Sequence, residues 1–451
     1  MQSIAAHPTT IAAVATPAGV GAVSLVRVSG PAALAVADLA TGGRASRMVP
    51  RSTHHCRILD AAGEVLDDGL MVVFRAPNSF TGEDSVEFSG HGGMLVTHEV
   101  LARFLTCGAV GAGPGEFTQR AFLNGKMDLT QAEGVMDLIA AQTRLALRAA
   151  RSQLEGTLGR RTAEARDEVL ATLAHLEAWI DFPEEDIHPQ TGASLRAALR
   201  SVLSTIDALL ATAEQGRVLR DGARTVIFGA PNVGKSSLLN RLLGFERAIV
   251  SAAAGTTRDT IEEIVSIHGI PLRLVDTAGV RPAGDPLEAA GIQRTERQIE
   301  VADLLLDVAD ASLPRPPALT LPATGAKRLC LLNKSDLGEH PSWRDTVAVR
   351  LSCASGAGFE ELSMAIRDTL HFSEAEWGDH AVAINTRHQA SLQTARSALL
   401  AALDLLENPA TDPELAAIDL REALDALGEI AGRVDTEDLL GEIFSRFCIG
   451  K

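Results

Sequence analysis

The stretch that decides the fold of the central part of this chain reads Gly229-Ala-Pro-Asn-Val-Gly-Lys-Ser236. It follows a strand-like run, Thr225–Phe228, and opens a helical pattern over Ser236–Leu243. A strand, a G-x-x-x-x-G-K-S loop and a helix in that order form a P-loop, whose backbone N–H groups bind phosphate beside the helix N-terminus. We expect Lys235 to reach the β- and γ-phosphates of a nucleotide and Ser236 to ligate Mg²⁺. Alone, the loop indicates only an NTPase.

Three further motifs follow the P-loop in the order that GTPases use. They are Gly255-Thr-Thr-Arg-Asp259, then Asp276-Thr-Ala-Gly279 and Asn333-Lys-Ser-Asp336, the last two each ending a predicted strand. The Asp336 carboxylate can accept from guanine N1–H and the exocyclic amine, and adenine offers no such pair of donors. The ordered set predicts a GTPase. The predicted nucleotide-binding residues are Asn232, Val233, Gly234, Lys235, Ser236, Ser237, Ser251, Thr256, Thr257, Asp276, Thr277, Ala278, Gly279, Asn333, Lys334, Asp336, Ser352, Cys353 and Ala354.

The position that aligns the attacking water differs from Ras-like enzymes. Those enzymes place a glutamine just after D-x-x-G, and here the residue is Val280. Arg281 and Glu288 lie in the following loop and are candidates for that role. Each is equally well explained as an ordinary solvated surface charge.

The pattern of the rest of the chain places this nucleotide domain inside a larger body. Strand-like runs alternate with helices from about 224 to 370, which is typical of a doubly wound α/β domain. Helical stretches of like composition flank it, which predicts one helical domain split by an insertion. Short β-like runs and turns before residue 120 predict an α+β domain. The predicted boundaries are 1–124, 125–220, 221–375 and 376–451. The predicted strands of the α/β domain are Thr225–Phe228, Leu272–Val275, Leu304–Val308, Leu329–Leu332 and Val347–Leu351.

Composition limits the class of protein. Of the 451 residues, 46% are hydrophobic, which is ample for packed cores, and the net charge of −17 argues against a general polyanion-coating surface. Five dispersed cysteines without C-x-x-C spacing indicate reduced thiols. The uncharged segment 8–26 contains Pro17, Gly19 and Gly21, so we expect two buried strands around a turn there and no signal or membrane segment. These features predict a soluble cytoplasmic protein.

Beyond the GTPase motifs, six further stretches carry information: Phe80-Thr-Gly-Glu-Asp84, Gly90-His-Gly-Gly93, Pro114-Gly-Glu-Phe117, Arg120-Ala-Phe-Leu-Asn124, Lys126-Met-Asp-Leu129 and Phe447-Cys-Ile-Gly-Lys451. With the GTPase motifs, they resemble the MnmE (TrmE) family of bacterial tRNA modification GTPases along the whole chain. The C-terminal C-x-G-K ending is especially specific. The resemblance implies an N-terminal dimerisation domain that binds 5-formyl- or methylene-tetrahydrofolate, a helical domain and an inserted G domain.

The resemblance also implies a reaction and partners. Together with the flavoprotein MnmG, members of the family add an aminomethyl or carboxymethylaminomethyl group to C5 of the wobble uridine of certain tRNAs. They act as homodimers, and K⁺ with G-domain dimerisation replaces an external arginine finger. A cation beside the β/γ bridge neutralises developing charge as such a finger would.

Carried over to this sequence, the resemblance assigns metal ligands and a water-positioning residue. Ser236 and Thr257 would hold Mg²⁺, and Glu288 would orient the water. With Glu288, Lys235, Arg281 and Cys448 complete the predicted catalytic set. The predicted K⁺ ligands are Asn232, Ser251, Ala253 and Thr256.

The folate site is selected by the resemblance alone. Its residues here are Arg27, Glu87, Lys126 and Lys451. The set is chemically reasonable, because a carboxylate can bind the guanine-like edge of a pterin and cations suit the glutamate tail. Cys448, near the end of the chain, is either a thiol that acts near the one-carbon chemistry or a small packed residue.

Two questions stay open at this stage. The arginines of the helical stretch 144–166 form either a tRNA-phosphate surface or a solvated helix face. The alternative function is a ribosome-assembly or signalling GTPase switch without covalent chemistry. An ATP-using P-loop enzyme is opposed by the Asn333–Asp336 motif.

Overall fold

The computed structural model describes residues 9–181, 191–245, 262–275, 297–317, 324–372, 382–407, 413–432, 437–445 and 447–450. They fall into two compact units, residues 1–136 with 429–451 and residues 137–428, and each unit is described by itself. The four-part boundaries expected from the sequence stay a prediction. Within the described part of the chain, no helix is both long enough and apolar enough to cross a membrane.

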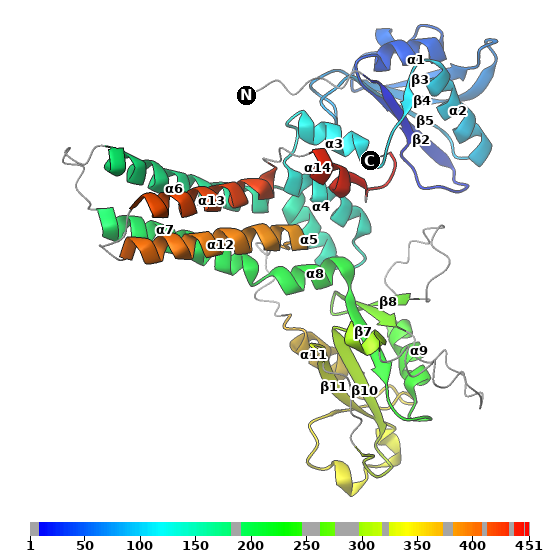
Figure 1. The fold of residues 1–451 in the computed structure, drawn as a ribbon. Helices are drawn as coiled ribbons and strands as arrows, with labels where there is room; N and C mark the ends of the chain where they lie inside the picture. The colour runs from blue at the N-terminus through cyan, green and yellow to red at the C-terminus, as the bar shows by residue number, and fades with distance from the viewer. Residues whose placement is uncertain are drawn as a thin grey trace. The chain divides into compact units, whose positions relative to one another are not determined.

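The first unit is built on a six-stranded sheet in the order β3-β4-β5-β2-β1-β6, of which Figure 1 labels β2, β3, β4 and β5. All neighbours are antiparallel except β1 and β6. The first two strands flank an exposed turn at 17–22, which confirms the two strands predicted for segment 8–26. The strands are β1 (Ile11–Val14), β2 (Val23–Ser29), β3 (Thr53–Leu59), β4 (Val65–Phe74), β5 (Ser85–His91) and β6 (Val110–Gly111).

Helices cover the two faces of this sheet unequally. α1 (Ala33–Thr41) and α2 (Met94–Thr106) pack on one face, where Phe88 of β5 and Phe104 of α2 are buried in the same core. On the other face, α3 (Glu116–Leu123) reaches only the β1 end, where Phe117 packs on Ile11 and Ala13. Much of the second face is therefore left to polar and half-exposed side chains.

The C-terminal segment returns to this first unit. α14 (Glu437–Ser445) packs with α3 and with the start of α4 (Leu129–Ala140) through Leu440 and Phe444. Residues beyond it lie beside the loop before α3, where the Gly115 N–H donates to the Cys448 carbonyl at 3.3 Å. The two ends of the sequence thus belong to one folded unit.

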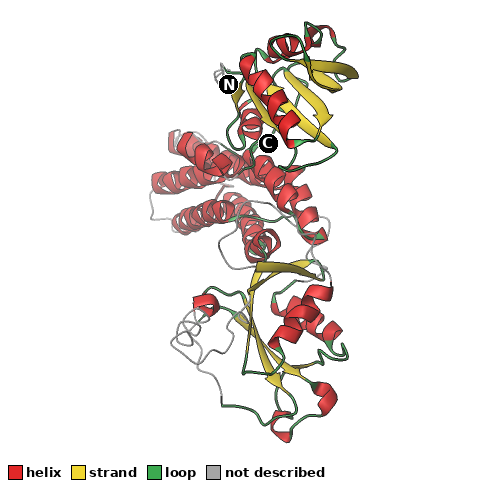
Figure 2. Cartoon of the chain, turned by 90° about the vertical axis from the view of Figure 1, so that its right-hand side faces the viewer, coloured by secondary structure: helices red, strands yellow, loops and turns green. Residues whose placement is uncertain are grey.

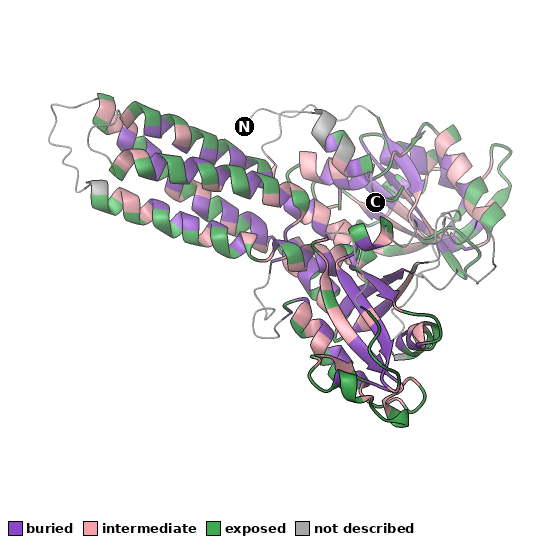
Figure 3. Ribbon diagram, turned by 60° about the horizontal axis from the view of Figure 1, so that its bottom comes forward, coloured by how far each residue is buried: buried purple, intermediate pink, exposed green. Residues whose placement is uncertain are grey.

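The helical part of the second unit contains four long helices that run side by side, α6 (Thr157–Asp181), α7 (Thr191–Leu210), α12 (Thr386–Glu407) and α13 (Pro413–Ala431). Their buried residues line the inside of the bundle and their exposed residues the outside (Figure 3). Ion pairs join segments far apart in sequence, such as Arg396 with Asp207 at 2.6 Å. Helices from before and after the α/β region therefore form one body.

The second sheet has the order β12-β11-β10-β7-β9-β8 and is parallel except for β8, with helices beside it (Figure 2). The predicted fold class, a doubly wound domain inserted into a helical domain after an α+β domain, is confirmed. All five predicted strands are present, and β8, which begins at two glutamates, was missed. The elements are β7 (Ala223–Phe228), α9 (Lys235–Phe245), β8 (Glu262–Ile267), β9 (Ile270–Val275), β10 (Leu304–Asp310), β11 (Lys327–Asn333), β12 (Val349–Arg350) and α11 (Phe359–Thr369).

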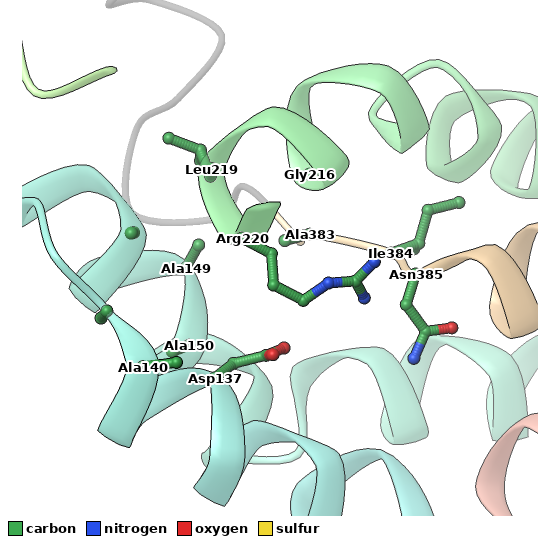
Figure 4. Close-up of a pocket in the computed structure, with 12 residues that line it drawn as sticks. Asp137, Ala140, Ala149, Ala150, Gly216, Leu219, Arg220, Ala383, Ile384 and Asn385 are labelled. Carbon is green, nitrogen blue, oxygen red and sulfur yellow. The ribbon is translucent and has the colours of Figure 1, made fainter. Parts of the chain in front are cut away.

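The chain enters and leaves this inserted domain at adjacent points. α8 (Ala213–Asp221) leads into β7, and the Thr212 hydroxyl before it donates to the Val382 carbonyl at 2.8 Å. A Cβ on Gly216 would lie 3.0 Å from backbone atoms of Ile384. The segment 382–385, by which the chain returns from the inserted domain, therefore packs directly on α8. A cavity of about 20 Å³, room for about one water, lies here between α8, the returning segment and α5 (Arg144–Leu154), and Figure 4 shows Arg220 pointing into it.

Candidate functional site

The predicted nucleotide-binding loops meet where the strand order of the second sheet reverses. β7 lies between β9 on one side and β10 on the other, and the connections after it run to opposite sides. In open parallel sheets, ligands bind at the carboxyl ends of the strands at such a point. The loop 229–234 follows β7 there, Asp310 is the last residue of β10, and the segment 333–336 begins at the last residue of β11.

At two positions of the P-loop, the backbone conformation and its close neighbours leave no room for a side chain. Gly229 has φ 147°, and a Cβ on it would lie 2.1 Å from the Val308 carbonyl oxygen. Gly234 has φ 99°, and a Cβ there would lie 2.2 Å from Nδ2 of Asn333. Asn232 also takes a left-handed conformation, with φ 61°, and its side chain is exposed. Both glycines are therefore required by close contacts with neighbouring elements.

Lys235 begins α9 and folds back over the P-loop. Its Nζ donates to the carbonyl oxygens of Gly229 at 2.9 Å and Ala230 at 2.7 Å. Burial lowers the pKa of this ammonium group from its ordinary value. Ser236 and Ser237 follow on the first turn of the helix, and both are exposed. A cation and two hydroxyls thus stand at a helix N-terminus, which suits phosphate and Mg²⁺.

Asn333 holds three loops together. Its side chain is buried, its Nδ2 donates to the Val233 carbonyl at 2.8 Å, and its Oδ1 accepts from the Cys353 N–H at 3.1 Å. Both ends of the amide are used within the protein. Asn333 therefore positions the P-loop against the segment 352–354, and this contact was not foreseen from its place in the motif.

Lys334 links the same region to β10. Its Nζ donates to the Asn232 carbonyl at 2.9 Å and to Asp310 Oδ2 at 2.6 Å. Burial raises the pKa of Asp310, but hydrogen bonds from Lys334 and Ser312 outweigh it and lower the pKa below its ordinary value. Sequence analysis missed Asp310, because nothing in the local pattern at the end of β10 marks it as the partner of a lysine 24 positions later.

The predicted base-recognition residues lie around these anchors. Asp336 is exposed in a short turn directly after β11, and Ala354 is exposed in the loop that Asn333 fixes. Ser352 is buried, and its hydroxyl accepts from the Ser355 N–H at 3.2 Å. Burial raises the pKa of the Cys353 thiol and Arg241 opposes this, so the group is a neutral thiol near pH 7. The exposed carboxylate thus follows directly on a segment that Asn333 joins to the phosphate-binding loop.

Eleven predicted site residues lie outside the described residues. The set includes the water-positioning candidate, one Mg²⁺ ligand, most of the K⁺ ligands and one folate residue. These residues are Ser251, Ala253, Thr256, Thr257, Asp276, Thr277, Ala278, Gly279, Arg281, Glu288 and Lys451.

The first unit contains a second candidate site, a cavity of about 260 Å³. Arg27 of β2 and Glu87 of β5 stand opposite each other in the register, and Nε and Nη2 of the arginine both lie 2.8 Å from Glu87 Oε1. The guanidinium carbon is 5.4 Å from the Phe80 ring centroid and 5.6 Å from that of Phe117. The charged pair is thus fixed by aromatic contacts as well as by hydrogen bonds.

The rim of this cavity carries further cations. Lys126 is exposed, and its Nζ donates to the Pro77 carbonyl at 2.9 Å. Arg51 also lines the cavity, and sequence analysis missed it because no motif surrounds it. Cys448 is exposed and is not among the lining residues. The residues that line the cavity are Arg27, Arg51, Phe74, Asn78, Ser79, Phe80, Thr81, Ser85, Glu87 and Lys126.

Three of the matching sequence stretches meet at Arg120, which is fully buried. Its guanidinium donates to Glu116 at 2.7 Å and to Glu83 at 3.2 Å. Glu83 in turn accepts from the Ser29 hydroxyl at 2.9 Å, which also lies 2.7 Å from the hydroxyl of the cavity-lining Thr81. The network therefore helps to position Thr81, one of the residues that line the cavity.

Some arginines of the basic stretch 144–166 are exposed, and others are bonded to a neighbouring residue. Arg144 and Arg148 are exposed on α5. Arg151 is paired with Glu155 at 2.9 Å, and Arg160 donates to the Glu155 carbonyl at 2.8 Å. Glu155, between α5 and α6, thus engages two of these arginines, and a tRNA surface here stays a prediction.

Two sequence families match the chain. Residues 129–448 match the family described as the MnmE helical domain, and residues 10–126 match the one described as the GTP-binding protein TrmE N-terminus. Among similar proteins, the tRNA modification GTPase MnmE of Akkermansia muciniphila is 53% identical over 98% of this chain and 99% of its own length. The protein of that name from Opitutus terrae is 47% identical over 98% and 99%. That from Chloroflexus aurantiacus is 44% identical over 98% and 99%.

Proposed function

The chain belongs to the MnmE (TrmE) family of tRNA modification GTPases, and from this premise we propose that it hydrolyses GTP to drive modification of the wobble uridine in certain tRNAs. It acts with the flavoprotein MnmG, and the group added to C5 is aminomethyl or carboxymethylaminomethyl. The observation that supports the GTPase assignment is the exposed Asp336 carboxylate, three residues after Asn333, whose side chain binds the P-loop. Such a carboxylate selects guanine through two hydrogen bonds that adenine cannot make.

In the proposed hydrolysis, the chain binds and orients GTP and aligns water. P-loop N–H groups and Lys235 bind the β- and γ-phosphates, so the Lys235 ammonium exchanges its two carbonyl partners for phosphate oxygens. Glu288 orients the attacking water, since Val280 cannot.

Two metal ions complete the proposal for this site. The exposed Ser236 hydroxyl fits Mg²⁺ and would hold it together with Thr257. The exposed Asn232 side chain fits K⁺, with Ser251, Ala253 and Thr256 as further ligands. When bound, both ions neutralise charge on the phosphates.

We further propose that the cavity of the first unit binds a tetrahydrofolate derivative. Glu87 uses one oxygen for Arg27, and its other oxygen can accept from a pterin edge, while Arg51 and Lys126 at the rim suit carboxylates. Lys451 belongs to the proposed set. The group would supply a one-carbon unit. We expect Glu87→Gln to weaken binding of 5-formyltetrahydrofolate, measured by calorimetry on the full chain, and unchanged affinity would contradict the assignment.

The alternative, a GTPase switch without covalent chemistry, is disfavoured by this second cavity. A switch has no use for a half-buried arginine–glutamate pair, 15% and 24% exposed, opening on a cavity of about 260 Å³. The two functions also predict different effects of losing the gene. Only a tRNA-modifying enzyme would leave wobble uridines unmodified, and the test measures this.

The test is complementation of a strain that lacks the gene. We expect wobble uridines, read by mass spectrometry, to lose their modification and to regain it with the wild-type chain but not with Asp336→Asn. The variant should bind xanthosine triphosphate in place of GTP, because an amide presents a donor where the carboxylate presents an acceptor. Asp345→Asn, an exposed aspartate in the same domain, is the matched control. Full modification without the gene would reject the proposal.

A further inference from the structure

Two aspartates and a histidine gather at one end of the first sheet, on β4 and β5, and a second histidine on β3 contacts one of the aspartates. Asp67, Asp68 and His91 each offer a ligand atom, and these atoms all lie within 4.8 Å of one another. On the neighbouring strand, His55 Nε2 lies 3.3 Å from Asp68 Oδ2. His91 is four residues along β5 from Glu87, roughly 13 Å, so the cluster is separate from the cavity described above.

The register places His55, Asp68 and His91 on one face of the sheet. Leu70 stands opposite Ser89 on β5 and opposite His55 on β3. Alternate residues of a strand share a face, so Asp68, His55 and His91 all project from the face that α1 and α2 do not cover. Their side chains are 51%, 62% and 70% exposed, in that order, so an ion could reach them directly from solvent.

Asp67 holds His91 in one orientation. The carboxylate is only 5% exposed, and it accepts from the His91 ring Nδ1 at 2.7 Å and from the His91 backbone N–H at 2.9 Å. With Nδ1 carrying the proton for this bond, the lone pair is on Nε2. A buried carboxylate behind a histidine is the arrangement that metal sites use to orient an imidazole ligand.

The motif that contains His91 is built around this contact. A Cβ on Gly90 would lie 2.1 Å from Asp67 Oδ2, so Asp67 occupies the space that a side chain at position 90 would need. A Cβ on Gly92 would lie 2.5 Å from the Gly21 carbonyl oxygen. The glycines of Gly90-His-Gly-Gly93 thus leave room for the carboxylate and the neighbouring loop, and the motif presents a single oriented imidazole. Neither the proposed GTP hydrolysis nor the proposed folate site uses Asp67 or His91.

We propose that Asp68 and His91, joined by the exposed side chain of His55 once it turns from Asp68 toward the ion, ligate one divalent transition-metal ion of the zinc class, with Asp67 as the carboxylate that orients His91. Two imidazoles and one carboxylate form a ligand set that suits Zn²⁺ or Co²⁺ and leaves a position for water. The hard cations of the nucleotide site prefer oxygen ligands, so they do not compete strongly here. The ion would link β3, β4 and β5 at their exposed end.

The test is titration of the full chain with Co²⁺ as a spectroscopic probe, followed by displacement with Zn²⁺, in buffer that holds saturating Mg²⁺ and K⁺. We expect one equivalent to give visible d–d absorption. His55→Asn and Asp68→Asn should abolish it, and Asp67→Asn should weaken binding by about 10–100-fold. The matched control is His54→Asn, the neighbour of His55 on β3, whose ring contacts the Val49 carbonyl instead.

Two controls keep the outcome unambiguous. Repeating the titration in a Cys448→Ser background excludes the exposed thiol, which would add near-ultraviolet charge-transfer bands. Melting curves with Zn²⁺ should show stabilisation of the wild type and of His54→Asn but not of Asp68→Asn. Unchanged Co²⁺ binding in Asp68→Asn, or no d–d absorption in the wild type, would overturn the proposal. Neither result would affect the GTPase assignment.

Discussion

At the scale of single residues, the described part of the first unit contains one charged side chain, that of Arg120, with no exposed surface. Arg120 is fully buried and shares its guanidinium between Glu83 and Glu116. Taking these charges out of water is unfavourable, and the pairing offsets that cost only while every partner is present. The residue belongs to a stretch that matches a tRNA-modifying family, yet in this structure its contacts are internal.

Truncation of Arg120 should therefore be costly. We expect Arg120→Ala to lower the free energy of unfolding of the first unit by about 3–5 kcal/mol, because two carboxylates lose their partner. Urea unfolding followed by circular dichroism measures this. Arg75→Ala, which removes the half-exposed pair with Asp84, should cost no more than about 1 kcal/mol. Equal losses in the two variants would show that burial is not the cause.

At the scale of elements, the loops after β7, β10 and β11 form one assembly. Asn333 joins the P-loop to the segment 352–354, and Lys334 joins it to Asp310 at the end of β10. Each contact spans a large separation in sequence. A change in one loop therefore alters the geometry of the others.

The Asp310–Lys334 pair should make the stability of this domain depend on pH in one direction. The folded pKa of Asp310 is lowered, so its contribution is complete above the ordinary pKa of 3.8 and is lost as the pH falls through the lower folded value. We expect Asp310→Asn to cost roughly 1.5 kcal/mol near pH 7, the low end for such bonds because Lys334 is 34% exposed. The difference from wild type, measured by chemical unfolding, should shrink below about pH 4. A difference that grows in acid would contradict this assignment.

The elements also show which structural features can be predicted from the sequence and which cannot. The P-loop, its flanking strand and its helix follow from local pattern, because glycine spacing and apolar alternation act within a few residues. β8 was missed because its first residues, Glu262 and Glu263, interrupt the apolar pattern. Asp310, Arg51 and the buried role of Arg120 depend on partners far away in sequence, and no local pattern specifies those partners.

At the scale of the whole molecule, the two candidate sites lie in different compact units. The nucleotide loops belong to residues 137–428, and the Arg27–Glu87 cavity belongs to the unit formed by both ends of the chain. A ligand stabilises the state that it binds. Each ligand should therefore act first on its own unit.

Hydrogen exchange read by mass spectrometry can separate the two. GDP with Mg²⁺ and K⁺ should slow exchange in peptides that cover 229–237 and 333–336. The probe 5-formyltetrahydrofolate should slow exchange around 78–81. In Asp336→Asn the first effect should disappear and the second should remain. Protection of 229–237 by the folate probe in that variant would contradict separate sites.

The adjacency of Thr212 and Val382, joined by a 2.8 Å hydrogen bond, has an evolutionary consequence. A segment whose two ends meet at one point can be gained or lost in a single recombination event, without separating the helices on either side of it. The host gene keeps its reading order and its own termini. An ancestor with only the helices and the N-terminal sheet is therefore physically plausible, and the nucleotide-binding segment would then be the later arrival.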